Sequence, residues 1–429
     1  MIYLNNAATT YPKPPAVLRA WQEALAHPPA NAFRSTEAAA EGGDVMTACR
    51  TLLGQALGIA DASRIYFSSG ATESINKLLL GLQPLGLPVL ATLTEHNSVL
   101  RPLHNLPGLA GAQLATSNGD PKHEPQTGGG VLAPASPSQW VSCTASGLLC
   151  LDDLEEKLRR LDAERGCRAY ACLLVVNHCS NVTGAVQDIG AIARIAHRHH
   201  ALLMVDAAQS AGCLPVRCDA WDVDLLAFTG HKGLFGPQGT GGYYVRRGID
   251  LRPVFYGGTG RDSSRLTYAD GAYEYEVGTQ NLPGIAALSA GVRYVLERGV
   301  ERIMAHEHEL MLALRQGLGA LPRVTVYGHD DDCKGPLLSL NVSGMTPFDV
   351  GFILHNAYDI TVRTGLHCSP LIHRALGTAA EGTVRISVSD LTTRQEVEAL
   401  VRAVGEIAAS SGEAYGADVK ENNDRSAGD

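Results

Sequence analysis

Short apolar runs alternate with helix-like patterns along the first two thirds of the chain, and this alternation constrains the fold more than any other feature. Residues 65–67 are apolar, 72–80 follow a helical period, and 88–93 are apolar again, which predicts a strand, a helix and a second strand. Such units are typical of an α/β fold whose mostly parallel sheet is buried on both faces. The pattern continues with expected helices over 151–161 and 189–200 and expected strands over 171–176, 202–206, 225–228 and 242–245.

The pattern changes from about residue 293, where a smaller α+β unit is predicted. Its expected elements are a long polar helix over 293–318, a strand over 337–342, a helix over 348–355 and a terminal helix from Arg394. Residues 117–140, which contain three consecutive glycines, are expected to be a loop insertion. We predict a large α/β domain over 15–292, a small α+β domain formed by 1–14 with 293–409, and a disordered tail over 410–429.

Composition excludes several classes of protein. The chain has 429 residues, of which 45% are hydrophobic and 18% charged, as in an ordinary globular protein. Its net charge of −9 argues against a nucleic-acid partner. No apolar run reaches the length of about 20 residues that a membrane span needs, and the first residues lack the layout of a signal peptide, so we expect a cytoplasmic protein. Ten cysteines are too sparse for a disulfide framework.

Chemistry-bearing residues follow three of the predicted strands. Asp206 ends the apolar run 202–206, Lys232 comes shortly after the run 225–228, and the small-residue turn 68–73 opens a helix. The carboxyl ends of parallel strands collect such groups, and a helix N-terminus favours a phosphate. Taken singly, the lysine could be a solvated charge and the aspartate a turn former. Together they meet the needs of pyridoxal phosphate (PLP), namely a Schiff-base lysine, a carboxylate for the ring nitrogen and a phosphate anchor.

Several segments together resemble one family of PLP enzymes. The chain is similar to fold-type I enzymes of the class V aminotransferase and cysteine desulfurase family. The matching segments are 4–10, 94–97, 180–184, 205–209, 229–232, 276–281 and 384–387. The resemblance implies a large mostly parallel-sheet domain, a smaller α+β domain, PLP as cofactor and a homodimer.

The resemblance also implies roles for individual residues. Lys232 would bind the cofactor and move protons, Asp206 would hold the ring nitrogen, and His96 would stack on the ring and act as acid or base. A packed core histidine is the alternative for His96. The cofactor would further be held by Ala71, Thr72, Asn181, Gln209, Thr229 and His231, with Thr279 reaching its phosphate from a second subunit. The substrate, an amino acid, would bind through Asn181, Arg363 and Arg385.

The segment 363–370 favours one member of this family, because it resembles the cysteine loop of desulfurases. Cys368 would be the nucleophile that takes sulfur from L-cysteine as a persulfide, releasing L-alanine and passing the sulfur to an acceptor protein. The compact loop resembles the second group of desulfurases, which serves iron-sulfur cluster assembly or selenocysteine cleavage. Two positions depart from the family pattern, Leu366 before His367 and Gln280 in place of a proline.

Other interpretations stay open at this point. The same residues would serve a selenocysteine lyase. A PLP-dependent lyase, aminotransferase or epimerase acting on another amino acid is a third possibility, with Cys368 structural, and a protein that only binds the cofactor is a fourth. We assign no metal site, because a zinc site built on His367, Cys368 and His373 lacks an evident fourth ligand. Cys172, Cys179 and Cys213 are expected to be packed core thiols.

Overall fold

The structure is a computed structural model that describes residues 1–26, 38–105, 114–115, 133–134, 140–258, 264, 266, 275–328 and 333–426. Only the backbone is described for 38–44, 114–115, 133–134 and 411–426. The predicted insertion over 117–140 lies almost wholly outside the described residues, apart from short strand β5 (Ala133–Pro134) and Trp140. In the predicted tail, 410–429, the described backbone is the end of helix α11 (Arg394–Ser426), and the side chains from 411 on lie outside the described residues, so the predicted disorder of this segment stays a prediction.

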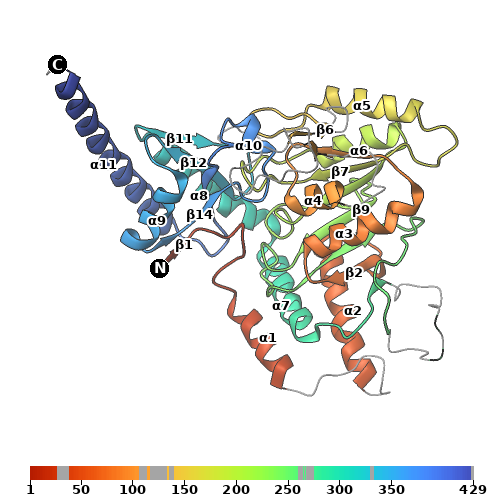
Figure 1. Ribbon diagram of the computed structural model, residues 1–429. Helices are drawn as coiled ribbons and strands as arrows, with labels where there is room; N and C mark the ends of the chain where they lie inside the picture. The colour runs from red at the N-terminus through yellow and green to blue at the C-terminus, as the bar shows by residue number, and fades with distance from the viewer. Residues whose placement is uncertain are drawn as a thin grey trace.

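A seven-stranded sheet forms the centre of the larger part of the molecule (Figure 1). All neighbouring strands are parallel except β10, which runs antiparallel to both of its neighbours. The predicted mostly parallel sheet is therefore confirmed, and the run predicted over 242–245 is its antiparallel strand. In spatial order the strands are β2 (Ile65–Ser68), β10 (Gly241–Val245), β9 (Leu225–Thr229), β8 (Leu202–Asp206), β7 (Leu173–Asn177), β3 (Val89–Thr92) and β6 (Trp140–Val141).

Helices cover both faces of this sheet. Side chains alternate between its two sides along each strand, and because both sets are apolar, each face has an apolar core that helices cover. In β7, Leu174 and Val176 belong to one apolar core, whereas Leu173 and Val175 belong to the core on the opposite face. The first core is covered by α2 (Ala38–Leu57), α5 (Leu151–Ala163), α6 (Ile189–Arg198) and α7 (Leu282–Arg298). Helix α1 (Pro15–Ala26) packs against α7. The second core is closed by α3 (Ala71–Leu82) and α4 (Asn97–Asn105).

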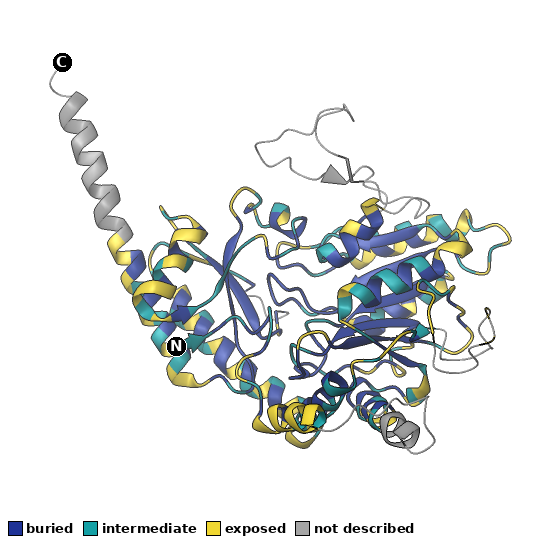
Figure 2. Cartoon of the chain, turned by 60° about the horizontal axis from the view of Figure 1, so that its bottom comes forward, coloured by how far each residue is buried: buried dark blue, intermediate teal, exposed yellow. Residues whose placement is uncertain are grey.

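A second, four-stranded antiparallel sheet lies beside the first (Figures 1 and 2). Its strands, in spatial order, are β11 (Val324–Tyr327), β12 (Leu337–Val342), β15 (Thr383–Ser387) and β14 (Arg363–Gly365). Leu4, next to the first strand of the chain, joins the apolar core of this sheet. The remaining elements here are α8 (Val300–Gly319), α9 (Pro347–Tyr358), α10 (Ile372–Ala375) and α11 (Arg394–Ser426), with the parallel pair β1 (Ile2–Tyr3) and β13 (Ile360–Thr361).

The prediction of a single helix over 293–318 is wrong. The chain instead forms α7 and α8, which meet at Gly299. Gly299 has a φ of 84°, a conformation that glycine adopts without strain and that ends a helix. Because α7 packs on the large sheet through Ile285, Leu288 and Val292, the break separates a helix of the large sheet from a helix of the small one. The division into domains given above stays our proposal.

No helix within the described ranges is long and apolar enough to cross a membrane. Remaining short elements are β4 (Leu114–Ala115) and two 3-10 turns, Ala62–Arg64 and Gln83–Leu85.

Candidate active site

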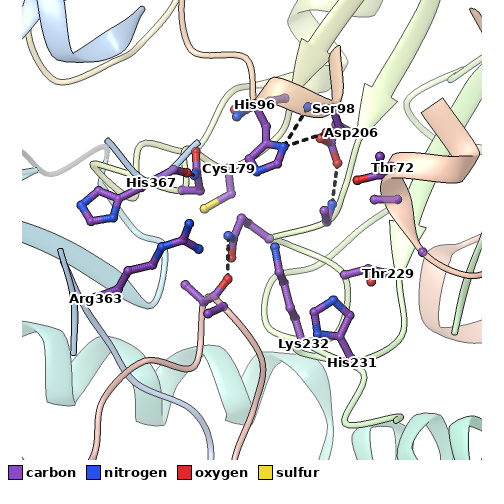
Figure 3. Close-up of a pocket in the computed structure, with 18 of the residues that line it drawn as sticks. Thr72, His96, Ser98, Cys179, Asp206, Thr229, His231, Lys232, Arg363 and His367 are labelled. Atoms are coloured by element: carbon purple, nitrogen blue, oxygen red, sulfur yellow. Dashed lines mark hydrogen bonds between the residues drawn. The ribbon is translucent and has the colours of Figure 1, made fainter. Parts of the chain in front are cut away.

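A cavity of about 280 Å³ lies where the carboxyl ends of the large-sheet strands face the small sheet. Figure 3 shows side chains of both parts of the molecule pointing into it, with Lys232 and His231 on one side and Arg363 opposite. The structure thus brings together nearly all of the site residues predicted from the sequence. Those that line the cavity are Ala71, Thr72, His96, Asn181, Asp206, Gln209, Thr229, His231, Lys232, Arg363 and Arg385.

The N-terminus of α3 forms one end of the cavity. Gly70 precedes the helix with φ 151° and ψ −179°, a region of backbone conformation that only glycine occupies readily. The first-turn N–H groups of a helix have no carbonyl partner within the helix, and they attract anions. Nearby, Thr229 Oγ1 and His231 Nδ1 are buried without a hydrogen-bond partner among the described residues. These open donors fit a phosphate group, so the residues present fit the anchor that PLP requires.

Lys232 and Asp206 form the charged centre of the cavity. Asp206 ends β8 and accepts a hydrogen bond from the Ala208 N–H at 2.9 Å. Burial raises the pKa of this carboxyl above its usual value. Burial, with Arg385 nearby, lowers the pKa of Lys232 to about 8. The lysine therefore has an appreciable fraction of neutral, nucleophilic amine near neutral pH, which suits the formation of a covalent bond to an aldehyde.

Glu95 was not among the predicted residues, although it lies within a segment that matched the family. It is fully buried behind the site and accepts hydrogen bonds from Thr92 Oγ1 at 2.6 Å and from the Asn177 N–H at 3.0 Å. Burial raises its pKa to about 8, and the charge of Asp206 adds to the rise. Near pH 7 the Glu95 carboxyl is therefore mostly protonated and adds little negative charge beside Asp206.

The ring of His96 is fixed by Ser98, a residue that sequence reasoning missed. The Ser98 N–H donates to His96 Nδ1 at 3.0 Å, so that nitrogen is an acceptor and Nε2 carries the proton. Burial and the positive charge of Lys232 lower the pKa of His96 to about 3. The histidine is therefore neutral, and its Nε2–H is a hydrogen-bond donor held in one orientation.

Two arginines of the small sheet provide a site for an anion. Arg385, on β15, is 1% exposed, and no carboxylate of the described residues lies within ion-pair distance of it. Its Nη1 donates to the Asn181 carbonyl at 3.1 Å and its Nη2 to Asn5 Oδ1 at 3.3 Å, while Nε has no partner among the described residues. Burial lowers its pKa to about 9. A buried guanidinium without a counter-ion is strongly stabilised by an anionic ligand, such as a substrate carboxylate.

Cys368 stands just outside the 280 Å³ cavity and lines two adjoining cavities instead. Its Sγ accepts a hydrogen bond from Arg363 Nη2 at 3.2 Å, and Arg363 itself lines the central cavity. His367 and Cys368 both have positive φ, 49° and 62°, an uncommon conformation for residues other than glycine. The backbone turn therefore presents the Cys368 sulfur in a constrained orientation, in hydrogen-bond contact with a guanidinium that also lines the central cavity.

Asn181 holds this cysteine loop in place. Its Nδ2 donates to the His367 carbonyl at 2.6 Å, and its Oδ1 accepts from Ser369 Oγ at 2.7 Å. The Asn97 N–H donates to the Cys368 carbonyl at 2.7 Å from the other side. The sequence placed Asn181 on the cofactor and the substrate; the structure shows that its side chain also contacts the cysteine loop.

Some predicted residues behave differently from the rest. Thr279 is exposed and does not line the cavity of this single chain, so its contact with a phosphate in a second subunit stays a prediction. Cys172 and Cys213 are buried as expected. Cys179 is also buried, yet its side chain lines the cavity (Figure 3), so it is more than the packed core thiol that the sequence predicts.

Comparison with known proteins agrees with this arrangement. Residues 2–128 and 139–400 match the model of the class-V aminotransferase family. A probable cysteine desulfurase of Methanothermobacter thermautotrophicus is 32% identical over 420 residues, which cover 95% of this chain and 94% of the relative. A solved structure of a cysteine desulfurase from Thermococcus onnurineus NA1 has 28% identity and a TM-score of 0.80, with 95% of both chains covered. For the cysteine desulfurase CsdA of Escherichia coli the values are 26%, 0.77 and 94% of both chains. Since the family model matches nearly the whole chain, this protein belongs to the class-V aminotransferase family.

Proposed function

We propose that this chain is a PLP-dependent cysteine desulfurase, which converts L-cysteine to L-alanine and keeps the sulfur as a persulfide on Cys368. The observation that carries the proposal is the hydrogen bond from Arg363 to the Cys368 sulfur, because Arg363 also lines the cavity that contains Lys232. A nucleophilic thiol is thereby positioned next to a site built for an amino acid and a phosphorylated cofactor. The relatives named cysteine desulfurase support the same function.

In this proposal PLP is held by Lys232, by Asp206 at its ring nitrogen and by the α3 N-terminus at its phosphate. When bound, PLP withdraws electrons from the amino acid and so weakens bonds at its carbon atoms. Thr229 and His231 have unpartnered buried atoms that suit further contacts to the phosphate.

The chain's own residues provide the remaining steps. Arg385 binds the substrate carboxylate and so orients the substrate. The Cys368 sulfur, positioned by its hydrogen bond from Arg363, attacks the substrate's sulfur as a thiolate. As the new sulfur–sulfur bond forms, the sulfur–carbon bond breaks and its electron pair stays with the carbon. Lys232 donates a proton to that carbon, which yields alanine.

The neutral His96 lines the cavity with its ring fixed by Ser98, carries its proton on Nε2 and stays uncharged near neutral pH. We therefore propose that His96 orients the reacting groups and is not a cation during the reaction. This departs from a simple acid whose pKa lies near 7.

A homodimer and a sulfur-acceptor protein belong to the same proposal. Thr279 is exposed in the single chain, as a residue that contacts a second subunit would be. Light scattering of the purified protein measures the mass: a value of twice 45.4 kDa agrees with the proposal, and 45.4 kDa contradicts the dimer. A cytoplasmic location stays a prediction.

Product analysis tests the function. The purified protein is incubated with PLP, L-cysteine and a thiol reductant, and alanine, sulfide and pyruvate are quantified for the wild type, Cys368→Ala and Lys232→Ala. The matched control is Cys167→Ala, because Cys167 is an exposed cysteine outside the site. We expect equal amounts of alanine and sulfide from the wild type and the control, and loss of both products in the other two variants.

Two other outcomes have clear meanings. Pyruvate and ammonia that persist in Cys368→Ala would show a lyase and overturn the persulfide mechanism. Turnover of selenocysteine that persists in Cys368→Ala, without turnover of cysteine in the wild type, would identify a selenocysteine lyase instead.

A further inference from the structure

Cys368 lines two cavities that adjoin the central one. It lines one adjoining cavity of about 360 Å³ and another of about 450 Å³. Neither contains Lys232 or Asp206. The first shares Thr72, His96 and Ser98 with the central cavity, and the second shares Arg363 and His367 with it, so both continue outward from the active site.

The ionisable side chains of arginine and histidine that line the larger outer cavity are all basic. Arg101, His104 and Arg363 line it, and no aspartate or glutamate is among its described lining residues. Arg101, which also lines the smaller outer cavity, lies on the exposed side of α4. No carboxylate of the described residues lies within ion-pair distance of its guanidinium. In a chain whose net charge is −9, this is a local cationic site beside the thiol.

The size of this outer cavity also limits its ligand. Sites for small molecules have volumes of about 300 to 1,000 Å³, a range that includes 450 Å³. Walls with one sign of charge raise the local concentration of ions of the opposite sign. The thiol at its inner end gives the ligand a reaction partner. These three features together describe a binding site for a small, negatively charged reactant.

We propose that the outer cavity lined by Arg101, His104, Arg363 and Cys368 binds a small thiol that carries a negative charge, and that this thiol is a further acceptor of the Cys368 sulfur beside an acceptor protein. The proposal rests on the proposed function, since it names the class of acceptor for the same site. In the transfer, the acceptor thiolate attacks the outer sulfur of the Cys368 persulfide. A sulfur–sulfur bond forms on the acceptor, the bond to Cys368 breaks, and Cys368 leaves as a thiolate, so no external oxidant or reductant is needed.

The first experiment measures the charge preference of the site without using the cofactor or the reaction. Cys368 in the coenzyme-free protein is alkylated with iodoacetate, which is anionic, and with iodoacetamide, which is neutral. The rate at Cys368 is followed by mass spectrometry of its peptide. The ratio of the two rates, divided by the same ratio for free cysteine, reports the local potential independently of the reactivity of the thiol.

We expect the anionic reagent to be favoured at Cys368, and we expect Arg101→Ala to lower the ratio about two- to fivefold. Arg101→Glu lowers it further, Arg101→Lys restores it, and added salt weakens the preference. The control Arg159→Glu reverses an exposed charge on α5, away from the cavity, and leaves the ratio unchanged. A ratio that does not respond to Arg101→Glu would overturn the proposal.

The second experiment measures sulfur transfer. The protein is loaded with L-cysteine and desalted, and discharge of the Cys368 persulfide is followed with 3-mercaptopropionate, 2-mercaptoethanol and cysteamine, which are anionic, neutral and cationic. At equal thiolate concentration we expect the anionic thiol to react fastest and Arg101→Glu to slow it selectively. Equal rates for the three thiols, or an equal effect of Arg101→Glu on all of them, would contradict the proposal. If no persulfide forms, the proposed function fails, while the alkylation ratio still reports on the site.

Discussion

At the scale of single residues, the position of Lys232 determines how the protein takes up its cofactor. The amine is nucleophilic only when neutral, and its pKa is lowered to about 8 by burial and by Arg385. Below this pH the amine is protonated and cannot attack an aldehyde. We predict that the rate of PLP uptake by the coenzyme-free protein rises with pH with a midpoint near 8, measured by stopped-flow absorbance.

The cause of this shift can be tested with the same measurement. Arg385→Gln removes a positive charge that disfavours protonated Lys232, so its midpoint should move to higher pH. Arg159→Gln, a change at an exposed arginine, should leave the midpoint in place. A midpoint close to 10.5 in the wild type, the ordinary value for lysine, would show that the amine is not desolvated.

Asn181 gives a second prediction at this scale. Its amide makes two hydrogen bonds to the cysteine loop, at 2.6 and 2.7 Å. Each such bond contributes about 0.5 to 1.5 kcal/mol, so Asn181→Ala should slow persulfide formation on Cys368 about tenfold in a single turnover. The spectral change on mixing the PLP-loaded protein with L-cysteine, which reports substrate binding, should stay nearly as fast as in the wild type.

The comparison variant is Ser369→Ala, which removes only one of the two hydrogen bonds and should give a smaller effect. If Asn181 acts mainly on the cofactor or the substrate, as the sequence indicated, its replacement would instead weaken PLP binding or raise KM while the single-turnover step stays fast.

Sequence reasoning found the residues of the site that stand at strand ends. Asp206 ends one apolar run and Lys232 comes shortly after another, so their place at one edge of the sheet follows from the fold alone. The loop contacts of Asn181 could not be predicted, because they join residues 186 and 188 positions apart. The bond from Ser98 to His96 is local, but no pattern in the sequence indicates it.

At the scale of elements, the turn into α3 has a conformation that a side chain would disturb. Gly70 has a φ of 151°, and an added Cβ would lie 3.4 Å from Thr229 Oγ1, one of the unpartnered atoms of the cavity. We predict that Gly70→Ala costs about 1 to 3 kcal/mol of stability, because the backbone region is nearly restricted to glycine. It should also weaken PLP binding, measured by titration of the coenzyme-free protein, because the first-turn N–H groups of α3 would shift.

Gly86→Ala separates these two effects. Gly86 also has positive φ, 60°, but an added Cβ there meets no atom within 4 Å. This variant should lose stability without any change in PLP affinity. Unchanged affinity in Gly70→Ala as well would show that the α3 N-terminus does not hold the phosphate.

Elements with a strong period were predicted closely, and weaker ones were missed. The strand expected over 202–206 is confirmed as β8, and the terminal helix begins at Arg394 as expected. By contrast, the helical pattern of the sequence continues across Gly299, and a single glycine within such a pattern does not by itself predict the end of a helix. The two-residue strands β1 and β13 have too few residues to show a period.

At the scale of the whole molecule, the first residues of the chain connect the small sheet to the lysine loop, which is the segment after β9 that contains His231 and Lys232. β1 pairs with β13 beside the small sheet, and Gln209 Nε2 donates to the Ala7 carbonyl at 3.1 Å. The single O–H of Thr10 lies between the carbonyls of His231 and Lys232, with Oγ1 3.1 Å from each oxygen. The cavity between the two sheets is therefore closed on one side by a segment that contacts both. No pattern in the sequence indicated this, because residues 1–14 form almost no regular structure.

Asn6 lies at the centre of this segment and gives the last prediction. It is 3% exposed; its Nδ2 donates to the Ser387 carbonyl at 3.0 Å, and its Oδ1 accepts from the Tyr11 N–H at 3.2 Å. Asn6→Ala removes both of these side-chain bonds: the Ser387 carbonyl keeps the bond from the backbone N–H of residue 6 at 3.4 Å, and the Tyr11 N–H loses its side-chain partner, at a cost of about 1 to 3 kcal/mol. We predict a lower Tm and faster loss of PLP on dialysis, because the segment also contacts the lysine loop. Asn356→Ala, which removes an exposed contact within α9, should change neither. A lower Tm with unchanged PLP retention would mean that the segment stabilises the small sheet without supporting the cavity.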